Sequence, residues 1–217
     1  MTPSLQYEGF GAVTKGGKDK RVVHVTNLNA TGPGSLYDAM GSSRTIVFDV
    51  AGIIKNFRWD GSGRNAVSHL TIDGSAAPSP GITLDNNNNG YCLTFEEGCH
   101  DIIVKNIRVR NAGEDGISVV GAYNMIFDHI SVAGSGDGCL DISRGAHHVT
   151  VQWSLFGPGK KGWTGPMLIA FPQQKISAFI HTCSAVLGWC GRKKSLCTQC
   201  HRLYPSRDFL PDVRLHK

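Results

Sequence analysis

The sequence predicts an all-β fold in which the chain coils into a parallel β-solenoid, and two repeated patterns carry that prediction. Three twelve-residue segments align without gaps at spacings of 23 and 24 residues: GCHDIIVKNIRV from Gly98, GAYNMIFDHISV from Gly121 and GAHHVTVQWSLF from Gly145. A second apolar series is interleaved with them: CLTF from Cys92, GISV from Gly116, CLDI from Cys139 and MLIA from Met167. Two strands per turn, repeated at this period, describe a solenoid.

Each aligned segment opens with Gly and a small or polar residue and then alternates apolar with polar or mixed positions. This alternation is typical of a strand with one buried face. Helical repeats fit poorly, because Val, Ile and Thr fill the segments and Gly recurs inside any helix one would draw.

The N-terminal part predicts two strands, a helix and a loop. Arg21–Thr26 and Thr45–Val50 are apolar or alternating runs bounded by turn residues. Between them, Ser35 and Asp38 resemble a capping box, which predicts a short helix over Leu36–Met40. An open solenoid end exposes unpaired backbone and core side chains, so this helix is expected to cover the first coil. Residues 53–68 are polar and predict a loop.

Composition divides the chain near residue 175. The formal net charge of +5 comes from residues 176–217, which carry seven basic and two acidic side chains, whereas residues 1–175 carry 15 of each. We therefore expect a solenoid domain over 1–175 and an atypical basic, Cys-containing tail over 176–217. No run approaches the roughly 18 apolar residues of a membrane span, and Met1–Glu8 lacks the basic start and apolar stretch of a signal peptide.

Two explanations of the tail remain open. In the first, the reading frame slips near Lys175, so that the final residues do not belong to the solenoid and are disordered. In the second, the tail is an appended module with a zinc site that would also bind phosphate or nucleic acid weakly. Its candidate zinc ligands do not follow the paired Cys-x-x-Cys spacing: Cys183, Cys190, Cys197, Cys200 and His201.

The stretch from Glu114 to Asp141 holds the strongest candidate site. Asp-Gly occurs at Asp115-Gly116 and Asp137-Gly138, and Asp141 follows four residues after Asp137. If the chain coils once per copy, Asp115 and Asp137 lie on adjacent rungs, about 4.8 Å apart. Asp141 faces the same way as Asp137, because strand side chains alternate with period two. Three carboxylates would then converge on one exposed position and could bind a hard cation such as Ca²⁺.

Simpler roles compete with each candidate. Asp-Gly is also a common turn signal. Asp128-His129 occupies the same repeat positions as Lys105-Asn106 and Gln152-Trp153, which favours a stacking role over acid–base chemistry. His147-His148 would place the two rings on opposite faces, which favours a solvated or hydrogen-bonded pair over a joint metal site. Cys92, Cys99 and Cys139 are expected as small packed residues, although the sequence does not decide their pairing.

Six stretches, in order along the chain, together resemble one enzyme family: GFGA, VTNLNATGPGSL, RTIVFDVAGII, LTIDGSAAP, FDHIS and VQWSLFGPGKKG. Over about residues 9–175 the chain is similar to the pectate lyases of polysaccharide lyase family 1, which are right-handed parallel β-helix enzymes. The resemblance implies a right-handed parallel β-helix with a short N-terminal capping helix, truncated at its C-terminal end.

The same resemblance implies site residues and an activity. Asp115, Asp137 and Asp141 match the family's Ca²⁺ ligands, and Lys160-Lys161 matches its substrate-binding lysine, with Lys161 preferred. The family's catalytic arginine has no matching motif, and Arg192 is the nearest basic residue. The implied activity is Ca²⁺-dependent cleavage of α-1,4-polygalacturonate by β-elimination, impaired by loss of the last coils. The alternative is an inactive β-helix that binds acidic polysaccharide.

The resemblance also implies a secreted, monomeric protein whose partner is pectate, with no membrane or nucleic-acid partner. The signal peptide that secretion would require is not found in this sequence.

Overall fold

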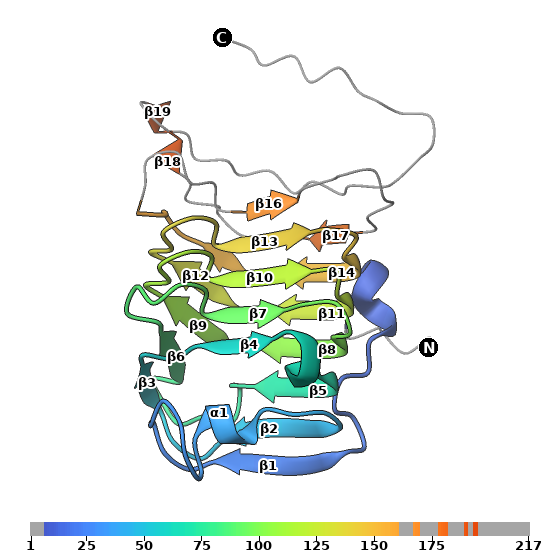
Figure 1. Cartoon of the computed structure of the whole chain (residues 1–217), viewed down its shortest axis with the longest axis vertical. Helices are drawn as coiled ribbons and strands as arrows, with labels where there is room; N and C mark the ends of the chain where they lie inside the picture. Colours follow the sequence, from blue (N-terminus) through green and yellow to red (C-terminus); the bar gives the residue numbers. More distant parts are fainter. Residues whose placement is uncertain (1–6, 161–166, 170–177, 182–188, 191–192, 195–217) are drawn as a thin grey trace.

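A computed structural model describes residues 7–160, 167–169, 178–181, 189–190 and 193–194. Over these residues the chain coils as a parallel β-helix whose rungs stack along one axis (Figure 1). The predicted fold class is confirmed. The tail residues Arg192, Cys183, Cys197, Cys200 and His201 lie outside the described residues, as does Lys161.

Within the described residues, three parallel sheets form the walls of the coil. The first contains β1 (Arg21–Val25), β2 (Arg44–Phe48), β5 (Ser68–Asp73), β8 (His100–Lys105), β11 (Tyr123–Asp128), β14 (His147–Gln152) and β17 (Ala178–His181). The second contains β4 (Trp59–Gly61), β7 (Leu93–Phe95), β10 (Ile117–Val120), β13 (Leu140–Ser143) and β16 (Met167–Ile169). The third contains β3 (Gly52–Lys55), β6 (Ile82–Asp85), β9 (Ile107–Arg110), β12 (Ser131–Ala133) and β15 (Leu155–Phe156). A separate antiparallel pair is formed by β18 (Trp189–Cys190) and β19 (Lys193–Lys194).

Both repeated series of the sequence form strands in the expected order. The aligned segments from Gly98, Gly121 and Gly145 contain β8, β11 and β14, which pair in parallel. The interleaved apolar series forms β7, β10, β13 and β16. Farther on, β17 pairs in parallel with β14, so residues 178–181 continue the first sheet. The domain boundary at residue 175 stays a prediction.

The first coil is covered as expected. The helix α1 (Leu36–Ala39) begins after Ser35, whose hydroxyl accepts a hydrogen bond from the Asp38 backbone N–H at 3.2 Å. Leu36 and Ala39 are buried in the main core beside β1 (Figure 1). A hydrophobic face of this short helix therefore closes the end of the coil.

Two 3-10 helices complete the described elements, η1 (Phe10–Val13) and η2 (Gly63–Asn65). η1 packs on the outside of β11 and β14. It is tied there by the Gly11 N–H, which donates to Oγ1 of Thr150 at 2.9 Å. A Cβ on Gly11 would overlap the Met125 carbonyl oxygen, so only glycine permits this close approach.

The expected loop over 53–68 is wrong in part, because β3, β4 and η2 lie within or across it. β3 and β4 are held by parallel pairing to β6 and β7. Pairing with neighbouring coils outweighs the local polarity that predicted a loop.

The core is the interior of the coil. Trp59, Phe95 and Phe127 come from three successive coils and pack with tilted rings, whose centroids are 5.5 Å and 6.3 Å apart. Cys92, Cys99 and Cys139 are buried free thiols in the same core, as expected of packed cysteines. In the part of the chain that is described, no helix is long and apolar enough to cross a membrane.

Candidate functional site

The acidic candidates lie where the third sheet turns into the second. Ile117 of β10 pairs with Leu140 of β13, so Asp115, two residues before Ile117, is level with Gly138 rather than with Asp137. The Gly138 N–H donates to Oδ1 of Asp115 at 2.8 Å. Asp115 and Asp137 are therefore on adjacent coils, as predicted, but offset by one residue along the strand direction.

Asp141 lies within β13, on the outer face of the second sheet. Its strand neighbours Leu140 and Ile142 are fully buried in the core, whereas Asp141 is only partly buried. Across the sheet Asp141 pairs with Ser118 of β10 and Leu168 of β16. The alternation that predicted an outward Asp141 is confirmed.

Burial, with repulsion between carboxylates added to it, makes Asp115 and Asp141 hard to ionise. Burial, followed by the charges of Asp115 and Asp137, raises the pKa of Asp141 to about 7. Burial also raises the pKa of Asp115 to about 6; the hydrogen bond from Gly138 opposes this rise, and the charges of Asp137 and Glu114 add to it. The carboxylates are thus close enough to influence one another strongly.

The cluster lacks an internal counter-charge. Among the described residues, no Lys or Arg forms an ion pair with Asp115, Asp137 or Asp141. Oδ1 of Asp141 is buried and has no hydrogen-bond partner. Buried carboxylate oxygens are normally paired, hydrogen-bonded or bound to metal. Oxygen donors with uncompensated negative charge are the ligands that Ca²⁺ prefers, so these residues fit the expected cation.

The convergence of all three carboxylates on one ion stays a prediction. In the described part of the chain, one group of three potential ligands has its ligand atoms all within 4.8 Å of one another, and that group is His69, His100 and Asp101.

Tyr91 is a site residue that the sequence analysis did not single out. Its neighbour Cys92 donates its backbone N–H to the Asp115 carbonyl at 3.3 Å, so Tyr91 lies one coil before Asp115. Burial raises the pKa of the Tyr91 hydroxyl, and the charges of Asp115, Glu114, Asp137 and Asp141 add to the rise. The sequence could have identified Tyr91, because Tyr91 directly precedes the segment CLTF just as Asp115 directly precedes the aligned segment GISV.

Lys160 contacts the loops that carry Asp115 and Asp137, and also the loop of Asn88. Its ammonium donates to the Asn88 side-chain oxygen and to the Ala112 carbonyl, the latter at 3.2 Å. Its backbone N–H donates to the Ser135 carbonyl at 2.8 Å. Lys160 is thus anchored to the loops that precede the acidic cluster, and its role as a substrate contact stays a prediction.

The predictions for the two adjacent pairs that contain histidine, Asp128-His129 and His147-His148, differ in outcome. Asp128 pairs with Lys105 and Gln152 across the first sheet, and the ring of His129 stacks near Trp153, as the repeat positions predicted. For His147 and His148 the expectation of opposite faces is wrong, because their Nδ1 atoms are 2.8 Å apart. His148 has φ of 53°, which breaks the extended alternation and brings both rings to one side. The hydrogen-bonded pair itself is confirmed.

Together the fold and site define a parallel β-helix protein with an acidic cluster at the edge of its second sheet. No family model matches the chain. Over 159 residues, or 70% of the chain, it is 40% identical to probable pectate lyase C of Aspergillus fumigatus and 41% identical to that of Emericella nidulans. The chain spans 36% and 35% of the length of these two relatives.

A crystal structure of Jun a 1, the major allergen from cedar pollen, has a similar fold, with a TM-score of 0.56 and 20% identity over 81% of this chain and 62% of that one. By sequence, this chain is a homologue of these probable pectate lyases and corresponds to about a third of their length.

Proposed function

We propose that the protein binds pectate at the outer face of the second sheet and cleaves it by β-elimination, with Ca²⁺ held by Asp115, Asp137 and Asp141. The acidic cluster carries the proposal, since it holds an unpartnered buried oxygen on Asp141 and no basic partner among the described residues. The names of the fungal relatives supply the substrate class.

Because the site is negatively charged, it requires a bound cation in order to bind a polyuronate. Pectate carries a carboxylate on each unesterified sugar, and a cluster of carboxylates repels it. Bound Ca²⁺ would bridge the protein and sugar carboxylates and, as a Lewis acid, stabilise charge that develops on the uronate carboxylate as the neighbouring proton is removed.

Other residues would position the acidic cluster or bind the sugar chain. Thr94 and Ser118 lie in the same row of the second sheet as Asp141 but are buried, so they would position the acidic cluster rather than contact the sugar. Lys160 supplies positive charge beside these loops, and Lys161, which lies outside the described residues, is the preferred substrate contact. We propose Arg192, also outside the described residues, as the base.

The direct test is the ultraviolet absorbance of the unsaturated product formed from polygalacturonate by the full chain. We expect absorbance to rise with Ca²⁺, to stop with a chelator, and to be abolished by Asp137→Ala. Asp49→Ala is the matched control, because Asp49 is an exposed carboxylate paired with His24 far from the cluster. A rise that persists in the chelator, or that Asp137→Ala leaves unchanged, would refute the assignment.

A second function is favoured by one observation: no described arginine accompanies the acidic cluster as an ion pair. In that case the protein binds acidic polysaccharide without cleaving it. Ca²⁺-dependent retention on immobilised pectate without product formation would identify this function. In either case we propose a secreted, monomeric protein.

A further inference from the structure

A second cluster of potential metal ligands lies on the first sheet, whereas Asp141 of the acidic cluster lies on the second. His69 comes from β5, and His100 and Asp101 come from β8. One potential ligand atom from each of these residues lies within 4.8 Å of the other two. All three residues are partly exposed, so an ion could reach them from solvent.

The solenoid register brings these residues together. Ser68 pairs with His100, which sets the starts of β5 and β8 side by side. His69 and Asp101 both have φ of 53°. The strands are therefore kinked at the same position on two coils, and the side chains do not alternate there. As a result, His100 and Asp101 point to the same side, with Nδ1 of His100 at 2.8 Å from Oδ2 of Asp101.

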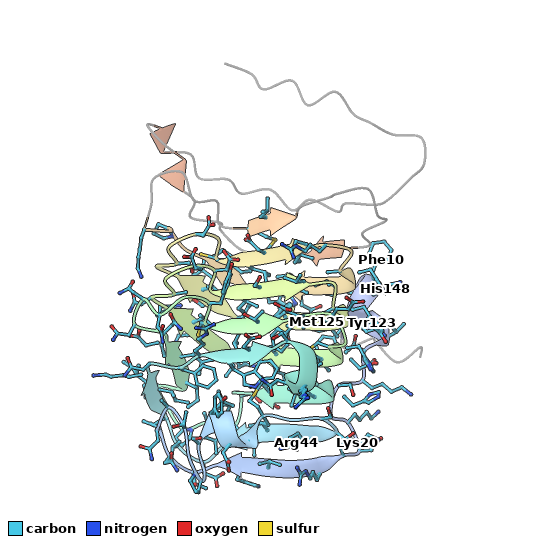
Figure 2. The ribbon with its side chains drawn as sticks, viewed as in Figure 1. Phe10, Lys20, Arg44, Tyr123, Met125 and His148 are labelled. Atoms are coloured by element: carbon cyan, nitrogen blue, oxygen red, sulfur yellow. The ribbon has the colours of Figure 1, made fainter. Side chains whose placement is uncertain are left out.

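Stacked rings hold the cluster in place. The ring of His100 stacks on Tyr123, with centroids 5.0 Å apart and 11° between planes. Tyr123 stacks in turn on His147 at 5.1 Å. His69 meets His100 edge to face at 5.3 Å. Tyr123 and His148, labelled in Figure 2, lie on the same side of the coil, where β11 and β14 begin. Because the rings are already ordered, binding an ion would cost little side-chain entropy.

We propose that His69, His100 and Asp101 form a site for a divalent transition metal of the zinc class. Two imidazoles and one carboxylate suit Zn²⁺, Co²⁺, Ni²⁺ or Cu²⁺ and do not suit Ca²⁺, which prefers oxygen ligands. Zinc ligands lie about 2.0–2.2 Å from the metal, hence within roughly 4.4 Å of one another. Small rotations of the partly exposed side chains are sufficient to reach that geometry. Three protein ligands leave a fourth position for water or another ligand.

The His100–Asp101 contact fits this site in either of two ways. Asp101 binds the metal directly, or it accepts the Nδ1–H of His100 and fixes the ring so that Nε2 faces the metal. In both arrangements the carboxylate strengthens binding, so Asp101→Asn should weaken affinity by about 10- to 100-fold.

The test measures Zn²⁺ binding to the full chain by calorimetry, with Co²⁺ absorption as a second readout. We expect one equivalent of Zn²⁺ that Ca²⁺ does not displace, and more than about tenfold weaker binding in His69→Ala and His100→Ala. His24→Ala is the control, because His24 also pairs with an aspartate, Asp49, at 2.7 Å but has no second histidine partner among the ring contacts of the described residues. A thermal unfolding transition measured without metal shows that each variant is folded.

A separate variant tests whether the tail cysteines bind the Zn²⁺. A chain with Cys183, Cys190, Cys197 and Cys200 replaced by Ser should keep the equivalent of Zn²⁺, and its Co²⁺ spectrum should lack sulfur-to-cobalt charge transfer. Zn²⁺ binding that survives in folded His69→Ala and His100→Ala, or that disappears with the tail cysteines or with His147→Ala alone, would overturn the proposal. Because the readout is binding, its failure is independent of pectate cleavage.

Discussion

The carboxylate of Asp115 accepts a hydrogen bond of 2.8 Å from the backbone N–H of Gly138, which lies 23 residues later in the sequence. This bond links two successive coils at the acidic cluster. It orients Asp115 toward the coil that supplies Asp137 and Asp141.

The stability of the metal-free protein should fall as pH rises from about 4 to about 7. The pKa of Asp141 is raised to about 7 in the folded chain, so the folded state holds a proton that the unfolded state has released. Stability from this group is present below its unfolded pKa and is lost as pH rises through the folded pKa. Melting temperatures measured in chelator across this range check the sign. Asp141→Asn should flatten the profile; an equally steep profile in that variant would exclude Asp141 as its source.

Ca²⁺ affinity should increase over pH 6 to 7, because protons and the cation compete for Asp115 and Asp141, whose pKa values are raised to about 6 and about 7. Calorimetric titration of the full chain at several pH values measures this. An affinity that does not change across the interval would contradict Ca²⁺ binding by these two carboxylates.

Gly138→Ala should displace Asp141 and weaken Ca²⁺ binding. A Cβ at Gly138 would overlap Oδ1 of Asp141, so either the side chain or the backbone must move. We expect destabilisation on the order of 1–3 kcal/mol, as for other overpacked sites. The double variant Gly138→Ala/Asp141→Ala removes the overlap and should recover part of this loss, and chemical denaturation of all four chains gives the coupling energy. If the stability losses of the two single variants sum to that of the double variant, the clash at Gly138 does not involve Asp141.

Asn86→Ala should destabilise the loop that presents Tyr91. The fully buried amide of Asn86 donates to the carbonyls of Phe57, Asn89 and Tyr91, and its oxygen accepts from the Asn89 N–H at 2.7 Å. Its loss leaves several buried groups unpaired, which costs about 1–3 kcal/mol for each group that water cannot reach. Urea denaturation measures the loss. Asn29→Ala, at an exposed position that is not among the positive-φ residues, is the comparison and should change stability much less.

Phe127→Ala should cost about 3–5 kcal/mol in free energy of unfolding. Phe127 is fully buried and continues the aromatic stack with Phe95. The exposed Val22→Ala should stay within about 0.5 kcal/mol. Comparable losses for the two variants would mean that the coil interior is not the stabilising core.

The β-solenoid, and the coils on which Asp115, Asp137 and Asp141 lie, could be predicted from the sequence alone. Repetition near 23 residues and period-two alternation are local signals, and the burial of Leu140 and Ile142 around an outward Asp141 follows directly from them. The short capping helix was also readable, because Ser35 and Asp38 form a local motif.

How residues meet between coils required the stacked structure. The offset that places Asp115 opposite Gly138 is already contained in the alignment of GISV with CLDI, but the hydrogen bond that joins the two residues forms only once the coils are stacked. At His69, Asp101 and His148 a positive φ interrupts the extended strand, so adjacent side chains no longer point to opposite faces. These kinks recur because neighbouring coils hold one another in register, so the His69, His100 and Asp101 cluster exists only once the coils are stacked.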